Sequence, residues 1–181
     1  KQKSLINQYD INTINLENEL EAIYLKKDNN TAILLTNNNQ SNAKIQVAEL
    51  LVKATTIIKN SISKKIEIDT IAPSIYLGWN TTNNLPFEVA KIRATRVLWA
   101  KFMLQFKPKN QHTLALKILI TNNNSTANLI AETSGAEIHN ANSEISNYFK
   151  NETFISKTID PWAGSTVVEK LTENFYTKTW D

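Results

Sequence analysis

The chain has 181 residues, 41% of them hydrophobic, and a net charge of +3 at pH 7, which suits one domain or part of a larger one. It has no cysteine, so disulfides and thiolate metal sites are excluded, and a reducing, cytoplasmic setting is expected. No apolar run approaches the about 18 residues of a membrane-spanning helix. Because lysines and acidic residues are interspersed, neither a membrane nor a nucleic-acid partner is expected.

The sequence of the first part of the chain predicts a polar segment followed by a strand and a helix. Residues 1–30 are expected to form an N-terminal extension, and residues 31–36 (TAILLT) a short buried strand. A helix should follow, capped by Ser41 or Asn42, because apolar residues recur at helical spacing over 47–58. This order begins a strand–helix alternation.

The next unit contains the clearest helix of the chain. Residues 74–78 (SIYLG) read as a strand, and residues 84–105 as a helix capped by Asn83 or Asn84. Glu88 is expected to complement the dipole of the first turn. The buried stripe of this helix is predicted to be Val89, Ile92, Trp99 and Met103.

The last part repeats the alternation. Residues 113–120 (TLALKILI) form the strongest strand pattern, typical of a parallel strand covered on both faces. A weaker strand is expected at 136–139, a short helix at 144–150 capped by Ser143, and a last short strand at 156–159.

A turn at 160–165 leads into the final predicted helix. Thr166 and Glu169 have the spacing of a capping box, and Val168, Leu171 and Phe175 share one face. Such alternation predicts an α/β fold with right-handed βαβ units. Because a closed eight-stranded barrel needs about 200 to 250 residues, a partial or remodelled (β/α) barrel with four or five strands is expected.

Two sequence blocks together resemble the catalytic barrel of methylmalonyl-CoA mutases. They are VAKIRATRVLW (89–99) and TIDPWAGS (158–165), the second followed by EKLTENFY. GAEIHNANS (135–143) is similar to that family's GTQSLHTNS, and the resemblance extends over residues 31–181. The resemblance implies a TIM-type barrel. Members of this family interconvert methylmalonyl-CoA and succinyl-CoA by radical chemistry. Their adenosylcobalamin is held over the barrel by a separate domain.

The chain departs from the family where reactive side chains are expected. Leu35 and Thr36 occupy the positions of the family's Tyr-His pair, and Ser74 replaces an arginine after Ala-Pro. The family's HxQTSGW reads LITNNN here (119–124), and the DxHxxG cobalamin signature is absent. The strand-end edge is therefore predicted to lack titratable and cationic groups. A helix between residues 124 and 134 is expected to be deleted or cut down.

These departures predict a non-catalytic small subunit. It is expected to bind no cofactor alone, and to pair with a large catalytic mutase subunit or with itself. Two alternatives remain: an active acyl-CoA mutase component, and a CoA-binding module in which Lys107, Lys109 and Arg93 face phosphates.

No residue is predicted to be catalytic, cofactor-binding or metal-ligating. The candidates for a family-specific or interface role are His139, Asp160, Trp162, Gly164 and Ser165. His139, matched to the histidine of GTQSLHTNS, is expected to be a hydrogen-bonded structural residue, with a role in the barrel as the alternative. Asp160 is expected to accept backbone N–H groups in its turn, rather than to form a carboxylate pair with Glu88.

The aromatic residues and the second histidine carry separate expectations. Trp162 either anchors a partner or closes the barrel end, since tryptophan is frequent at interface hot spots. Trp79 is expected to be exposed on the same edge, Trp99 to lie in the core, and His112 to be exposed. The Asn-rich segments 37–39, 80–84 and 122–124 all follow predicted strands, so they should gather at one edge.

Overall fold

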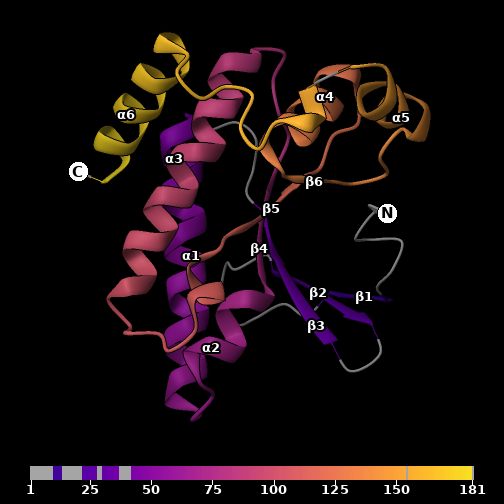
Figure 1. Ribbon diagram of the computed structural model, residues 1–181. Coiled ribbons are helices and arrows are strands. Elements are labelled where there is room, and N and C mark those ends of the chain that lie inside the picture. Colours follow the sequence, from indigo (N-terminus) through magenta and orange to yellow (C-terminus); the bar gives the residue numbers. More distant parts are fainter. Residues whose placement is uncertain (1–9, 14–21, 28–29, 37–41, 154, 181) are drawn as a thin grey trace.

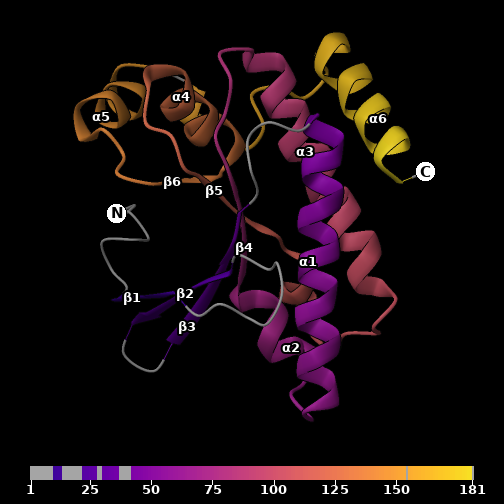
Figure 2. The same ribbon diagram turned by 180° about the vertical axis from the view of Figure 1, so that it is seen from behind.

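The computed structural model describes residues 10–13, 22–27, 30–36, 42–153 and 155–180 (Figures 1 and 2). Within these ranges six strands form one sheet in the order β1-β2-β3-β4-β5-β6. The strands are β1 (Asp10–Thr13), β2 (Ala22–Lys27), β3 (Asn30–Leu35), β4 (Ile75–Trp79), β5 (Lys117–Ile120) and β6 (Glu137–Ile138). The pairs β1–β2 and β2–β3 are antiparallel, and β3 to β6 run parallel. The fold is therefore α/β, with a parallel sheet extended by an antiparallel edge.

The helices alternate with the parallel strands. They are α1 (Ala43–Ser63), α2 (Ile68–Ile71), α3 (Leu85–Leu104), α4 (Ser125–Ser134), α5 (Ser143–Glu152) and α6 (Thr166–Trp180). Short 3-10 turns lie at η2 (Ala72–Ser74), η3 (Gln111–Leu114) and η4 (Ile155–Lys157). Both views show α1 and α3 side by side along the sheet with α6 beside them, whereas α4 and α5 lie near β6. No helix within the described ranges is long and apolar enough to cross a membrane.

The core lies between the parallel strands and the long helices. Alternate residues of β3, β4 and β5 join side chains of α1, α3 and α4 in one buried cluster, as the period-two alternation of a strand requires. Trp99 and Met103 of α3 are fully buried in it, so the predicted stripe of this helix is confirmed. The helix begins at the Asn84 cap, whose side chain accepts from the Phe87 amide.

Several sequence predictions are wrong in detail. Residues 156–159 form no strand, because the segment turns through η4 and a bend. The strand predicted at 113–120 is shortened to β5, since η3 takes its first residues. Helix α5 is capped by Asn142, whose side chain accepts two backbone N–H groups, and not by Ser143.

The chain's N-terminal region contributes to the sheet more than its polarity indicated. Strands β1 and β2 fall inside the segment predicted as an N-terminal extension, and they bring the described strands to six instead of four or five. Helix α4 remains in the segment where a helix was expected to be deleted or cut down, with 10 residues and a left-handed Gly135 at its end.

Gly78 of β4 lies close to side chains of β3 and of the residue that follows it. A Cβ added there would lie 2.8 Å from Cδ1 of Leu34 and 3.3 Å from Cγ2 of Thr36. Leu34 is buried, so its side chain has little room to move away, and a close-packed interior resists added volume.

We therefore expect Gly78→Ala to lower the free energy of unfolding by about 1–2 kcal/mol, measured by urea denaturation. Leu34→Val removes the methyl group in conflict. The double variant should therefore lose less stability than the two single variants together, by at least about 0.5 kcal/mol. Strict additivity would show that the two side chains do not compete for the same space.

Candidate functional site

The carboxyl ends of the parallel strands carry neutral polar residues that bind one another. The side-chain oxygen of Asn122, after β5, accepts from the Thr81 amide at 2.8 Å and the Thr81 hydroxyl at 3.2 Å, and its amide group donates to the Thr81 carbonyl at 3.0 Å. The Thr121 hydroxyl donates to the Asn80 side chain at 2.5 Å. The loop after β4 is therefore joined to the loop after β5.

The same pattern extends to β6. The Asn123 side chain donates to the Asn140 carbonyl, and the Asn128 side chain donates to Asn123 at 2.9 Å. The predicted gathering of Asn-rich segments is therefore confirmed for 80–84 and 122–124, whereas 37–39 lies outside the described residues. Amides that bind each other in this way hold three loops in register, and they provide neither a charge nor a general base.

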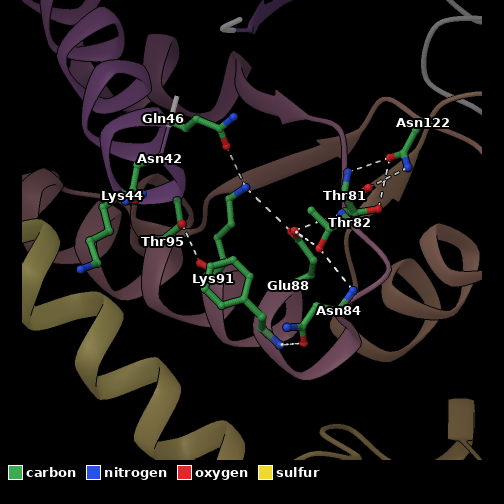
Figure 3. A network of polar contacts seen from close by, with 11 residues as sticks. Asn42, Lys44, Gln46, Thr81, Thr82, Asn84, Glu88, Lys91, Thr95 and Asn122 are labelled. Atoms are coloured by element: carbon green, nitrogen blue, oxygen red, sulfur yellow. Dashed lines mark hydrogen bonds and ion pairs between the residues drawn. The ribbon is translucent and has the colours of Figure 1, made fainter. Parts of the chain in front are cut away.

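Beneath this edge lies a buried charged pair that sequence reasoning missed. Glu88 and Lys91 of α3 are 1% and 2% exposed, and the Lys91 ammonium is 3.8 Å from Oε2 of Glu88. The ammonium donates to Oε1 of Gln46 in α1 at 3.1 Å and lies 4.7 Å from the centre of the Trp79 ring. Figure 3 shows this pair between α1 and the loop before α3. Lys91 therefore connects α1, α3 and β4.

Glu88 extends the network to the loop. Its Oε1 accepts from the Thr82 amide at 3.1 Å and the Thr82 hydroxyl at 3.0 Å, so it is more than the dipole partner predicted from its place in the first turn. Burial lowers the pKa of Lys91, and the Glu88 carboxylate works against this shift. The sequence does contain a signal for the burial of Lys91. Positions 88, 91, 92, 95 and 99 have helical spacing, which places Lys91 on the buried face of the helix.

A second polar cluster lies across β4, β5 and β6. Tyr76 and Lys117 are register partners, and the Lys117 ammonium lies 5.0 Å from the centre of the Tyr76 ring. The Tyr76 hydroxyl donates to the Glu137 carboxylate. Burial raises the pKa of Glu137, and both Lys117 and Tyr76 oppose that rise.

The two sequence blocks that carry the family resemblance meet in space. Arg93, from AKIRATR, binds Oε1 of Glu169 at 2.9 Å and lies 3.5 Å from Oδ2 of Asp160, the first residue of DPWAGS. Asp160 also accepts from the Trp162 amide at 3.1 Å, as predicted for a turn residue. Trp162 packs against the cluster that joins α3 to α6. The contact favours a role in closing the structure over one as a partner anchor.

The remaining residues of the turn shape its path. Gly164 has a φ of 79°, a left-handed conformation that glycine adopts freely, and the Ser165 amide donates to the Trp162 carbonyl at 3.1 Å. Glu169 binds Arg93, so its carboxylate points to α3 and does not complete the capping box predicted with Thr166. The turn residues therefore position α6 on α3.

Other predicted residues are placed as follows. His139 comes directly after β6, and its amide donates to the Ile120 carbonyl at 2.8 Å. Counted without a gap, the histidine of GTQSLHTNS falls on Asn140 and not on His139. His112 is exposed, as predicted, whereas Trp79 is buried at 2% exposure and the prediction of an exposed residue is wrong. Glu88 and Asp160 bind different partners and form no carboxylate pair.

Within the described residues, the edge contains groups that were not expected there. Lys53 of α1 donates to the Thr36 carbonyl at 2.9 Å, and His139 directly follows β6, so the expectation of an edge without titratable or cationic groups is wrong. The chain's two arginines are bound elsewhere. Arg93 pairs with the turn before α6, and Arg96 donates to the carbonyls of Ser134 and Gly135 at the end of α4.

The cations proposed to face phosphates do not converge. The Lys109 amide donates to Asp69, and its ammonium lies 3.8 Å from Glu67 near α2. Lys107 and Lys109 lie between α3 and β5, which is the amino end of that strand, whereas Arg93 faces α6. Among the described residues there is no group of three or more His, Cys, Asp or Glu that could hold a metal ion.

The fold and this edge together define a class of protein. It is an α/β protein. The loops at the carboxyl ends of its parallel strands are joined by hydrogen bonds of asparagine and threonine side chains. Side chains of α3 bind α1, α4 and α6. The chain belongs to the methylmalonyl-CoA mutase family, because the family model described as "Methylmalonyl-CoA mutase" matches residues 35–133 and 119–181. The two matched ranges overlap at β5 and α4.

Similar proteins are named as mutase subunits. The methylmalonyl-CoA mutase large subunit of Porphyromonas gingivalis is 29% identical over 170 residues, covering 76% of this chain and 24% of that protein. The large subunit of Propionibacterium freudenreichii subsp. shermanii is 26% identical over 170 residues, with 76% and 23% covered. A probable large subunit of Mycobacterium bovis is 33% identical over 75 residues, with 41% and 10% covered. The chain thus spans about a quarter of the length of the first two relatives.

The ion pair of Arg93 and Glu169 yields a prediction about stability. Both side chains are partly exposed, so a double-mutant cycle of Arg93→Ala and Glu169→Ala should give a coupling of about 0.5–1 kcal/mol in urea denaturation. Glu173, one turn further along α6 and exposed, provides the matched control. Arg93→Ala combined with Glu173→Ala should show no coupling, and equal coupling in both cycles would contradict a specific pair.

Glu137 yields a prediction about pH. Its pKa is raised in the folded protein, so the folded state binds more protons than the unfolded state just above the ordinary glutamate pKa. The stability that this proton provides is complete below that ordinary pKa and is lost as pH rises through the folded value. We therefore expect the free energy of unfolding of the wild type to fall relative to that of Glu137→Gln as pH rises through this window. A pH-independent difference between pH 4 and about 7 would contradict it.

Proposed function

We propose that this chain is a non-catalytic member of the methylmalonyl-CoA mutase family. In this proposal it is a remodelled segment of a TIM-type barrel. It serves in the cytoplasm as the structural partner of a cobalamin-dependent subunit, which interconverts methylmalonyl-CoA and succinyl-CoA. The family match supports the descent, and the named relatives are mutase subunits.

The observation that carries the proposal is the state of the strand-end edge. Leu35, at the position of the family's tyrosine, is fully buried in the core. Thr36, at the position of the histidine, offers its carbonyl to Lys53. The Asn122 side chain, in the segment that replaces HxQTSGW, binds Thr81 through both its oxygen and its amide group. Radical rearrangement needs positioned donors and excluded water, and carboxylate recognition needs a fixed charge. Neither arginine reaches this edge.

The sheet itself supports the idea of a remodelled segment. The four parallel strands β3 to β6 alternate with helices, as in one half of a barrel, whereas β1 and β2 continue the sheet in antiparallel pairing. Strand β3 thus pairs with β2 on the side where a (β/α) barrel would continue in parallel. The overlap of the two family matches at β5 and α4 fits a shortened connection there.

The family's adenosylcobalamin does not fit the groups at this edge. The amides of Asn122 and Asn123 are used on neighbouring loops, and the Lys53 ammonium, which donates to the Thr36 carbonyl, has no lone pair to offer a metal. We therefore assign no cobalamin chemistry to the residues of this chain, and the cofactor belongs to the partner subunit in the proposal.

Two alternatives are less well supported. An active mutase component would need the missing tyrosine, histidine and arginine to be replaced, and Lys91 with Glu88 cannot do this because both are sealed beneath the edge. A CoA-binding module would need converging cations, whereas Lys109 and Arg93 are engaged with acidic residues.

The proposal predicts assembly without turnover. The purified chain mixed with adenosylcobalamin and methylmalonyl-CoA should form no succinyl-CoA. Mixed with a methylmalonyl-CoA mutase large subunit of its own organism, it should elute in a complex well above its 20.5 kDa mass, measured by size-exclusion chromatography with light scattering.

The control is a large subunit alone, which fixes the elution volume and the rate without this chain. Isomerisation by the chain alone would overturn the non-catalytic part of the proposal. A monomer that never co-elutes with the large subunit would overturn the structural-partner part. The Leu35→Tyr, Thr36→His double variant should also remain inactive, because position 35 lies in the core between sheet and helices.

A further inference from the structure

Lys91 lies among buried polar atoms that lack hydrogen-bond partners among the described residues. An ammonium has three N–H donors, and the described residues take one of them, at Gln46 Oε1. Its 3.8 Å separation from Glu88 Oε2 is too long for a hydrogen bond. Oε2 of Glu88 and Nε1 of Trp79 are both buried without a hydrogen-bond partner among the residues described. Buried polar groups in folded proteins are nearly always paired.

The charges and the spacing define what fits there. Lys91 and Glu88 compensate each other, so an added ion would bring an unpaired buried charge, which is strongly unfavourable. The occupant must accept from an ammonium and donate to a carboxylate oxygen, and it must do so across 3.8 Å. A single oxygen atom at hydrogen-bond distance from both groups meets these conditions. Of small neutral molecules, water both accepts and donates twice.

We propose that Lys91, Glu88 and the ring of Trp79 form a binding site for one buried water molecule. This water bridges the ammonium to Oε2 of Glu88, while Oε1 holds Thr82. It completes a chain of hydrogen bonds from Gln46 in α1 to the loop before α3. The three side chains are each 2% exposed or less, so the water is enclosed and exchanges only when the protein opens locally.

A crystal structure of the chain at about 1.5 Å resolution tests the proposal. The expected result is a density peak at about 2.7–3.2 Å from both Nζ of Lys91 and Oε2 of Glu88. A direct contact shorter than about 3.2 Å between these two atoms, with no peak between them, would overturn it.

Solution NMR supplies an independent measurement on the wild-type protein. The Lys91 ammonium should give a cross-peak to a long-lived water, and its absence in a well-resolved spectrum would count against the site. In crystals of Lys91→Met the density peak should disappear. The matched control is Lys101→Met on the same helix, where the exposed side chain places its ammonium over the rings of Tyr176 and Trp180. That variant should keep both the peak and the cross-peak, and loss in both variants would contradict the assignment to Lys91.

Discussion

The arrangement of the helices depends on three cations of α3, each bound to a different element. Lys91 reaches α1, Arg93 reaches the turn before α6, and Arg96 reaches the carbonyls at the end of α4. A cation between packed helices is unfavourable unless acceptors are in place, so each of these contacts favours one position of the partner element over its alternatives. Through these contacts α3 positions α1, α4 and α6, and apolar clusters pack between the helices.

This constraint explains why two sequence blocks carry most of the family resemblance. AKIRATR supplies the cations of α3, and DPWAGS supplies a carboxylate and a tryptophan that meet Arg93 and the α3–α6 cluster. The blocks are far apart in sequence but form one contact. In this chain the two blocks contact each other through packing and ion pairing.

Sequence reasoning predicted the parts of the fold that depend on local pattern. The strands of the parallel sheet, the long helices α1 and α3 and the Asn-rich edge followed from periodicity and from capping residues. It failed where tertiary contacts override the pattern. Trp79 follows a strand and was expected to be exposed, yet it is buried. The Lys91 ammonium lies over its ring, and this contact offsets part of the cost of burying the charge. The pairing of β1 with β2 depends on the register between two strands, which no local period specifies.

The strand-end edge is joined to α3 through Glu88, whose Oε1 accepts from the Thr82 amide and hydroxyl. The buried clusters and the cations of α3 lie below the edge, and the edge residues bind mainly one another. Asparagine and threonine can occupy such an edge without leaving polar groups unpaired, provided that their side chains find partners in neighbouring loops. In this chain Asn122, Asn123 and Thr121 all do so.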